Sequence, residues 1–116
     1  MKEKIEAYIK VCEELGWKVF ENKYNNEIIL NQHSPAGEDF MFSVSVKNFV
    51  RDIGYYYESF DVEEHVAMWL NAKLHQEVGN VPDIHELLED ADYIKEDMLR
   101  PLVFAIEEEE AELNGQ

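Results

Sequence analysis

The stretch FMFSVSV, residues 40–46, constrains the fold of this chain more than any other feature. Its side chains alternate strictly between two sets, which is the period of a β-strand with one buried face. We expect Phe40, Phe42, Val44 and Val46 to point into a core, and Met41, Ser43 and Ser45 to point away from it. A strand of this kind belongs to an antiparallel sheet that helices cover on one side.

Two further strands are expected before it, at residues 17–23 and 27–32, joined by a turn at Asn25 and Asn26. Apolar residues recur at helical spacing elsewhere. The helices that this spacing predicts cover residues 2–15, 49–60, 61–75, 83–91 and 92–113. The element order α-β-β-β-α-α-α-α predicts an α+β fold, a three-stranded antiparallel β-meander packed against several helices. At 116 residues, the chain (1–116) is expected to form a single domain.

Several residues mark where these helices begin and end. Gly16 is expected to end the first helix, because glycine readily adopts the left-handed backbone conformation found there. Asn48 and Asp61 are expected to be N-cap residues. Pro101 is expected to kink the last helix near Met98 because it lacks an N–H. The acidic tail, residues 107–116, is expected to fray.

Charge is unevenly distributed over the chain, whose net charge is −16. Residues 1–60 hold 10 acidic and 7 basic residues, whereas residues 61–116 hold 16 acidic and 3 basic ones. Such a field repels nucleic acid and anionic membranes and attracts basic surfaces, so we expect no direct nucleic-acid or membrane binding. No apolar run approaches the roughly 20 residues that span a bilayer, and the N-terminus does not read as a signal peptide. A soluble, cytoplasmic protein is expected.

Complete catalytic and metal-binding motifs are missing from the sequence. His85 and Glu86 begin an H-E-x-x-H pattern that lacks its second histidine, and there is no nucleophile elbow or glycine-rich phosphate loop. The single cysteine, Cys12, is expected to be buried in the core. We therefore expect no enzyme activity, no metal and no cofactor.

The acids Glu38 and Asp39 follow the turn sequence Ser34-Pro35-Ala36-Gly37. Paired carboxylates could perform acid–base chemistry, but solvated acids in a turn are the favoured interpretation. A role as a binding loop is also left open.

A second group of acids lies within residues 86–97. The members are Glu86, Glu89, Asp90, Asp92, Glu96 and Asp97. On a helix, such acids could imitate the phosphates of DNA, which carries about one charge per 1.7 Å of axis, although a solvated face is the simpler interpretation. The tyrosines Tyr55, Tyr56 and Tyr57 are expected mainly in the core, with at least one hydroxyl free to meet a partner.

Three blocks of the sequence resemble a group of small acidic proteins of phages, plasmids and integrated elements. The shared pattern is S-P-x-G-E-D-F, then F-D-x-x-E-H-x-x-x-W, then V-P-x-x-x-x-L-x-x-D-A, within residues 31–98. The group supplies no catalytic residue. Small acidic proteins of such elements include anti-restriction and anti-CRISPR inhibitors, several of them DNA mimics.

The resemblance therefore implies an anti-defence inhibitor whose partner is a basic host protein, a nucleic-acid-binding nuclease or its complex. Two alternatives stay open. The chain could be a non-enzymatic interaction or accessory module of a mobile element, including a homodimer. It could also sequester a small ligand or nucleotide, which would need a basic pocket.

Overall fold

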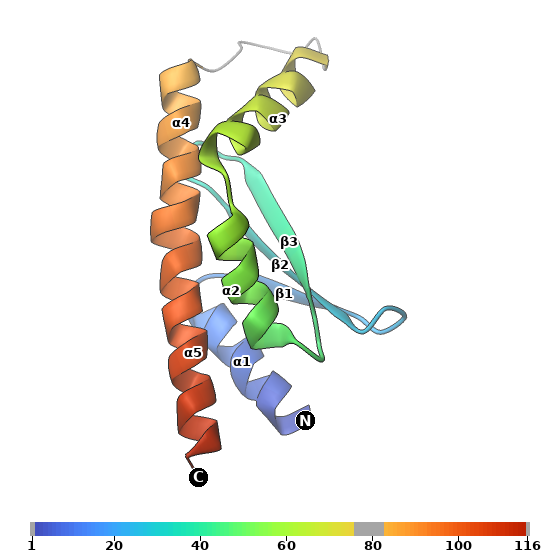
Figure 1. The fold of residues 1–116 in the computed structure, drawn as a ribbon. Helices are drawn as coiled ribbons and strands as arrows, with labels where there is room; N and C mark the ends of the chain where they lie inside the picture. Colours follow the sequence, from blue (N-terminus) through green and yellow to red (C-terminus); the bar gives the residue numbers. More distant parts are fainter. Residues whose placement is uncertain (1, 76–82, 116) are drawn as a thin grey trace.

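The computed structural model describes residues 2–75 and 83–115 and confirms the expected fold class (Figure 1). The order of elements along the chain is α-β-β-β-α-α-α-α. Their bounds are α1 (Lys2–Glu14), β1 (Lys18–Asn22), β2 (Glu27–His33), β3 (Asp39–Ser45), α2 (Phe49–Ser59), α3 (Val62–His75), α4 (Ile84–Tyr93), the π-helical turn η1 (Ile94–Leu99) and α5 (Arg100–Asn114).

The three strands form an antiparallel meander in the order β1-β2-β3. Leu30 in β2 pairs with Val19 in β1 and with Phe42 in β3. The inward-facing residues expected from the alternation of residues 40–46 therefore lie on the core side of the sheet. Phe40, Phe42 and Val44 are buried. The first hairpin turns at Asn26, whose φ of 52° is the left-handed conformation that asparagine tolerates.

The buried face of the sheet packs against α1, α2 and the last helical segments in one core. The helix α1 ends as expected at Gly16, where φ is +93°. The Trp17 N–H donates to the Cys12 carbonyl and the Gly16 N–H to the Glu13 carbonyl, which is the Schellman arrangement. The molecule is elongated, with extents of 52 × 29 × 22 Å.

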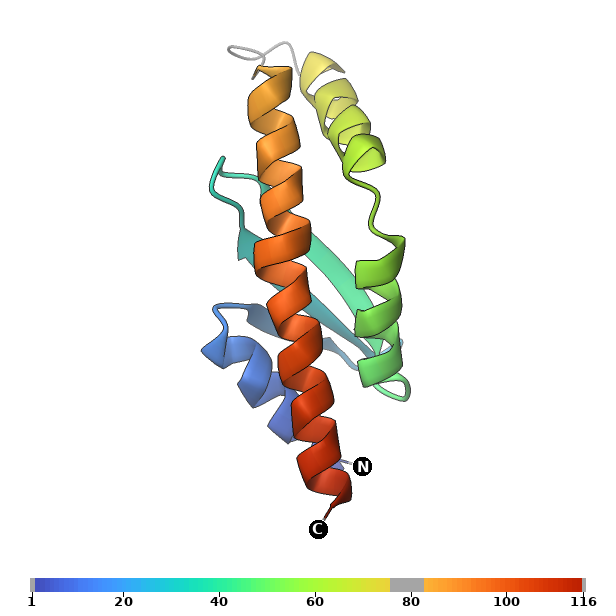
Figure 2. The same ribbon diagram turned by 60° about the vertical axis from the view of Figure 1, so that its left-hand side comes forward.

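The segments α4, η1 and α5 follow one another as a single uninterrupted rod, here called the long helix (Figure 2). Pro101 lies in the first turn of α5 and cannot donate to the preceding turn. The chain accommodates it by widening rather than by ending the helix, and the Arg100 N–H donates five residues back to the Lys95 carbonyl. The irregularity expected near Met98 is thus a π-helical turn.

The tail that was expected to fray, residues 107–116, belongs largely to α5. Helix α5 continues to Asn114 because Leu113 packs against the core. The Lys4 ammonium also donates to Asn114 Oδ1 at 3.0 Å, which ties the two ends of the chain together. Both termini lie at the same end of the molecule (Figures 1 and 2).

A second, smaller cluster joins α3 to α4 through Val66, Leu87 and Ala91. Asp61 caps α3 as expected, since its carboxylate accepts from the Glu64 N–H at 3.1 Å. Asn48 precedes α2 but makes no side-chain cap, so that expectation was wrong. No helix within the described ranges is long and apolar enough to cross a membrane.

Candidate partner-binding site

The loop of residues 34–38, between β2 and β3, is a compact turn closed by its own backbone. The Ser34 N–H donates to the Glu38 carbonyl, and the Gly37 N–H donates to the Ser34 carbonyl, both at 2.9 Å. Gly37 has φ of +88°, a conformation that glycine adopts without strain. The turn expected from Ser-Pro-Ala-Gly is confirmed.

Asp90 holds this loop against α4 and is not part of an exposed acidic face. It is 4% exposed. Its Oδ2 accepts from the Ser34 hydroxyl at 2.6 Å, and its Oδ1 accepts from the Ala36 N–H at 2.9 Å. The expectation that Asp90 serves as a phosphate substitute was therefore wrong, because both carboxylate oxygens are engaged inside the protein.

Glu38 is also turned inward, which overturns the expectation of a solvated acid. Only 13% of its side chain is exposed, and its Oε1 lies 2.8 Å from His65 Nε2 on α3. The imidazole packs edgewise against Phe40 and beside Phe60. Neither Glu38 Oε2 nor His65 Nε2 makes a well-aligned hydrogen bond among the described residues.

These contacts place a serine, a histidine and two acids near one loop without forming a nucleophilic site. The Ser34 hydroxyl donates to Asp90 and accepts from the Glu38 N–H at 3.0 Å, so its hydrogen-bonding capacity is used structurally. His65 lies against Glu38 rather than against the serine. The Asp90 carboxylate does accept from this hydroxyl, but Ser34 is only 5% exposed, so the pair forms an internal contact.

Asp39 differs from Glu38 because it stays exposed at the start of β3. Its Oδ1 accepts from the Asn31 amide, and His33 Nε2 lies 3.8 Å away. Asn31 itself is buried and also donates to the Phe40 carbonyl. Asp39 thus remains open to a partner while Glu38 does not.

The three consecutive tyrosines of α2 have three different environments. Tyr56 stacks on Phe42 with ring centroids 4.4 Å apart, and burial followed by the Glu38 charge raises the pKa of its hydroxyl. Tyr57 is half-buried against the core, whereas Tyr55 is 71% exposed. Of the three, Tyr55 is the one that a partner could contact directly.

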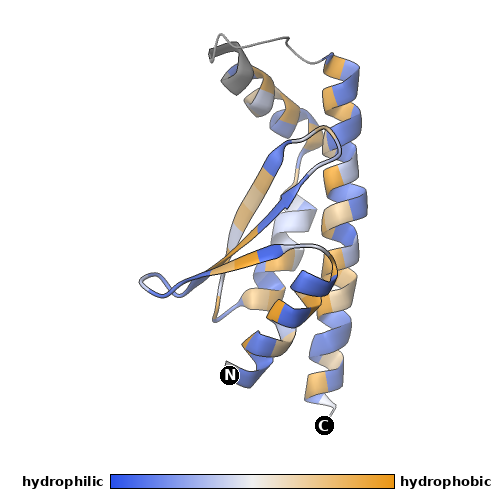
Figure 3. Ribbon diagram, turned by 180° about the vertical axis from the view of Figure 1, so that it is seen from behind, coloured by the Kyte–Doolittle hydropathy of each residue, from blue (hydrophilic) through white to orange (hydrophobic). Residues whose placement is uncertain are grey.

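The remaining acids of residues 86–97 lie on the surface of the long helix. Glu86, Glu89, Asp92 and Asp97 are exposed. Glu96 is half-buried and lies 3.5 Å from the Arg100 guanidinium. Figure 3 shows that hydrophilic residues, interrupted by hydrophobic ones, extend along the whole long helix.

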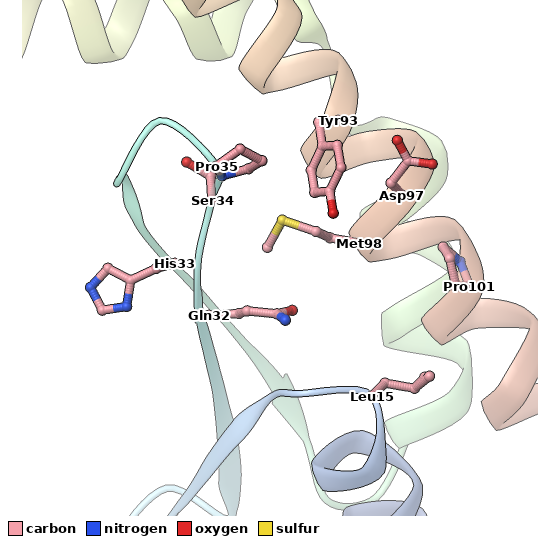
Figure 4. A pocket seen from close by; sticks show the side chains of 9 residues that line it. All are labelled: Leu15, Gln32, His33, Ser34, Pro35, Tyr93, Asp97, Met98 and Pro101. Atoms are coloured by element: carbon pink, nitrogen blue, oxygen red, sulfur yellow. The ribbon is translucent and has the colours of Figure 1, made fainter.

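A cleft of about 350 Å³ opens between the 34–38 loop and the π-helical turn. We call it the Tyr93 cleft; the nine residues that line it are labelled in Figure 4. Gln32, Tyr93 and Met98 reach into the space between strand and helix, whereas His33 points away. A second hollow of about 400 Å³ lies on the other side of Tyr93 and Pro35 and is lined by Glu86 and Glu89.

Comparisons with known proteins do not identify the chain. No protein-family model matches it, and no curated protein or solved structure matches it significantly. The described residues contain no group of three or more histidine, cysteine or acidic side chains that could hold a metal ion. The function must therefore be argued from the surface itself.

The three sequence blocks of the resemblance meet in this region. The first supplies Ser34 and Glu38, the second His65, and the third Asp90. Val81 and Pro82, which begin the third block, lie outside the described residues. The sequence pattern placed Glu86, Glu89, Asp92 and Asp97 on helical segments, where they are exposed, but it gave no signal for Tyr93 and Gln32, which only the fold brings to one cleft.

Proposed function

We propose that this protein is a non-enzymatic inhibitor that occupies the basic nucleic-acid-binding surface of a host nuclease or of its complex. The observation that carries the proposal is the row of carboxylates on the long helix. Five of them, from Glu86 to Asp97 and without the buried Asp90, lie within about 17 Å of helix axis at about 1.5 Å per residue. That spacing, about one charge per 3–4 Å, is close to one per 3.4 Å for a DNA strand.

The rest of the long helix is also negatively charged. Its three segments have 10, 6 and 15 residues, which corresponds to about 46 Å of rod. Glu107, Glu108 and Glu112 are exposed on α5, and the rod carries only two basic residues, Lys95 and Arg100. A continuous, negatively charged rod would be complementary to a groove shaped to hold a nucleic-acid backbone.

Such a surface would act by competition rather than by chemistry. Complementary charge accelerates encounter with a basic groove and makes binding sensitive to salt, because the Debye length is about 8 Å at physiological ionic strength. The Ser34–Asp90 contact supports the rod by fixing the 34–38 loop beside it. The anti-defence setting is what the resemblance to small acidic proteins of mobile elements adds to this proposal.

The test begins with capture of partners from a host lysate at low salt and their release at high salt. A captured nucleic-acid-binding protein is then loaded with a fluorescent duplex, and displacement of the duplex is followed by anisotropy. The wild-type protein should displace the duplex with a potency that falls steeply as salt rises.

Two matched triple variants distinguish the effect of this surface from the effect of net charge. Replacing Glu86, Glu89 and Asp92 by Gln, Gln and Asn should weaken displacement about tenfold, since exposed ion pairs contribute up to about 1 kcal/mol each. The control replaces Glu6, Glu13 and Glu14 on α1, all exposed, by Gln and changes the net charge equally. Equal potency of the two variants would contradict the proposal, as would displacement that does not respond to salt.

A further inference from the structure

The Tyr93 cleft combines an aromatic wall, a flexible sulfur and a carboxylate at its rim. Tyr93 is 42% exposed, and Met98 forms the buried side of the same wall. Asp97 and Pro101, from the next turn of the long helix, complete that side. The opposite side comes from Gln32 and Pro35 at the end of β2. A cleft of this composition suits a side chain that is flat, apolar on its faces and cationic at its edge.

The charge at the rim of the cleft is not neutralised from within the protein. Asp97 takes part in no ion pair among the described residues, and no lysine or arginine lines the cleft. The two basic residues of the long helix are directed elsewhere. Arg100 lies 3.5 Å from Glu96 and 5.5 Å from the Phe104 ring centroid, and Lys95 lines a different hollow beside Glu63.

The walls of the cleft are held in place before any partner binds. The Ser34 hydroxyl and the Ala36 N–H, which flank Pro35, both donate to Asp90 one turn before Tyr93. Gln32 lies directly over Gly16, since a Cβ added at that glycine would be only 2.7 Å from Gln32 Nε2. Preformed walls reduce the conformational entropy that is lost on binding.

We infer that the Tyr93 cleft receives an arginine side chain of the basic partner. The guanidinium would stack on the Tyr93 ring and donate to the Asp97 carboxylate, while the arginine methylenes contact Met98. Arginine is favoured over lysine because its planar head stacks on aromatic rings and is more weakly hydrated than an ammonium. The inference rests on the proposed function for the identity of the partner, and it names the contact that anchors it.

The test uses the whole isotope-labelled protein and three short peptides, acetyl-Gly-X-Gly-amide with X as arginine, lysine or citrulline. In NMR titrations, the arginine peptide should shift the backbone amides of Gln32, Tyr93 and Asp97, and the lysine peptide should shift them less. Citrulline has nearly the same shape without the charge and should leave them unmoved. Equal shifts with citrulline, or shifts spread along α5, would overturn the inference.

Two substitutions complete the test. Asp97→Asn should weaken arginine-peptide binding about fivefold, which corresponds to about 1 kcal/mol for an exposed ion pair. Glu6→Gln, at an exposed acid on α1 outside both the cleft and the long helix, should leave it unchanged. Equal effects of the two substitutions would mean that only the general field attracts the peptide, and the cleft would then have no role.

The two proposals can fail separately. The peptide titration needs no partner, so it can succeed even if no basic protein is displaced from its duplex. Conversely, if the duplex is displaced and Asp97→Asn competes as well as Glu6→Gln, the acidic rod is upheld and the anchor in the Tyr93 cleft is refuted.

Discussion

Asp90 is the acid whose replacement tests the architecture of the site most directly. Its two oxygens accept from the Ser34 hydroxyl at 2.6 Å and from the Ala36 N–H at 2.9 Å, and the residue is 4% exposed. Replacing Asp90 by alanine removes both hydrogen bonds and leaves two donors facing an apolar methyl group. The 34–38 loop then loses its attachment to α4.

The magnitude follows from the charge of the acceptor. Hydrogen bonds to a charged group contribute about 1.5–3 kcal/mol each, and the loss of two is partly offset because a carboxylate no longer has to be buried. We expect Asp90→Ala to lower the free energy of unfolding by about 3 kcal/mol. Ser34→Ala should cost about 2 kcal/mol, because Asp90 loses one donor and the Glu38 N–H loses its acceptor.

The assay is urea unfolding followed by circular dichroism, for the two single variants and the double variant. The coupling between Ser34 and Asp90 should be about 1.5–3 kcal/mol, since one charged hydrogen bond joins them. Asp92→Ala is the matched control. It makes the same change on the same helix at an exposed position and should stay within about 0.5 kcal/mol of the wild type.

The reasoning would be refuted if Asp90→Ala were as stable as Asp92→Ala, because Asp90 would then behave as a surface acid. Purely additive effects of Ser34→Ala and Asp90→Ala would equally contradict the direct bond. Either result would return Asp90 to the exposed acidic face that the sequence predicted.

Three further predictions concern the core and the turns. Phe42→Ala should cost about 3–5 kcal/mol in urea unfolding, since it opens a cavity beside Tyr56 and Trp17; an unchanged midpoint would disprove the register. Gly16→Ala should cost about 1–2 kcal/mol in the same assay, because an L-residue at φ +93° is strained and its Cβ meets Gln32; a neutral effect would contradict this. Burial raises the pKa of Cys12 to about 12 from 9.0, so unfolding releases a proton above pH 9. The free energy of unfolding should therefore fall between pH 9 and about 12 by up to ~1.4 kcal/mol per pH unit, and pH-dependent urea unfolding of Cys12→Ala should lack this contribution.

Much of the fold could be predicted because its signals are local. The alternation of residues 40–46 indicates one buried face whatever the rest of the chain does. Gly16, Asn26 and Asp61 act on their own turns through backbone conformation or a single hydrogen bond. The N-cap expected at Asn48 is absent, and nearby residues make the contacts there instead. The Ser45 hydroxyl accepts from the Asn48 N–H and donates to Asp52 in the first turn of α2.

The site was less predictable because its decisive contacts join distant residues. Ser34 and Asp90 are 56 positions apart, and no periodicity in the sequence links them. Glu38 and Asp39 are neighbours with the same charge, yet one faces His65 and the other faces solvent. Glu38 lies in the loop just before β3 and Asp39 is the first residue of that strand, and the packing of His65 on α3 encloses Glu38.

The sequence by itself determined the α+β class, the buried face of strand 40–46 and the excess of negative charge in the second half, because composition and periodicity act locally. The tertiary structure alone decided which of those charges a partner can reach. Asp90 is withdrawn from the surface because its two donors, on a loop far away in the sequence, replace water as its hydrogen-bonding partners. Glu86, Glu89, Asp92 and Asp97 remain exposed because the described part of the fold brings no such donors to them.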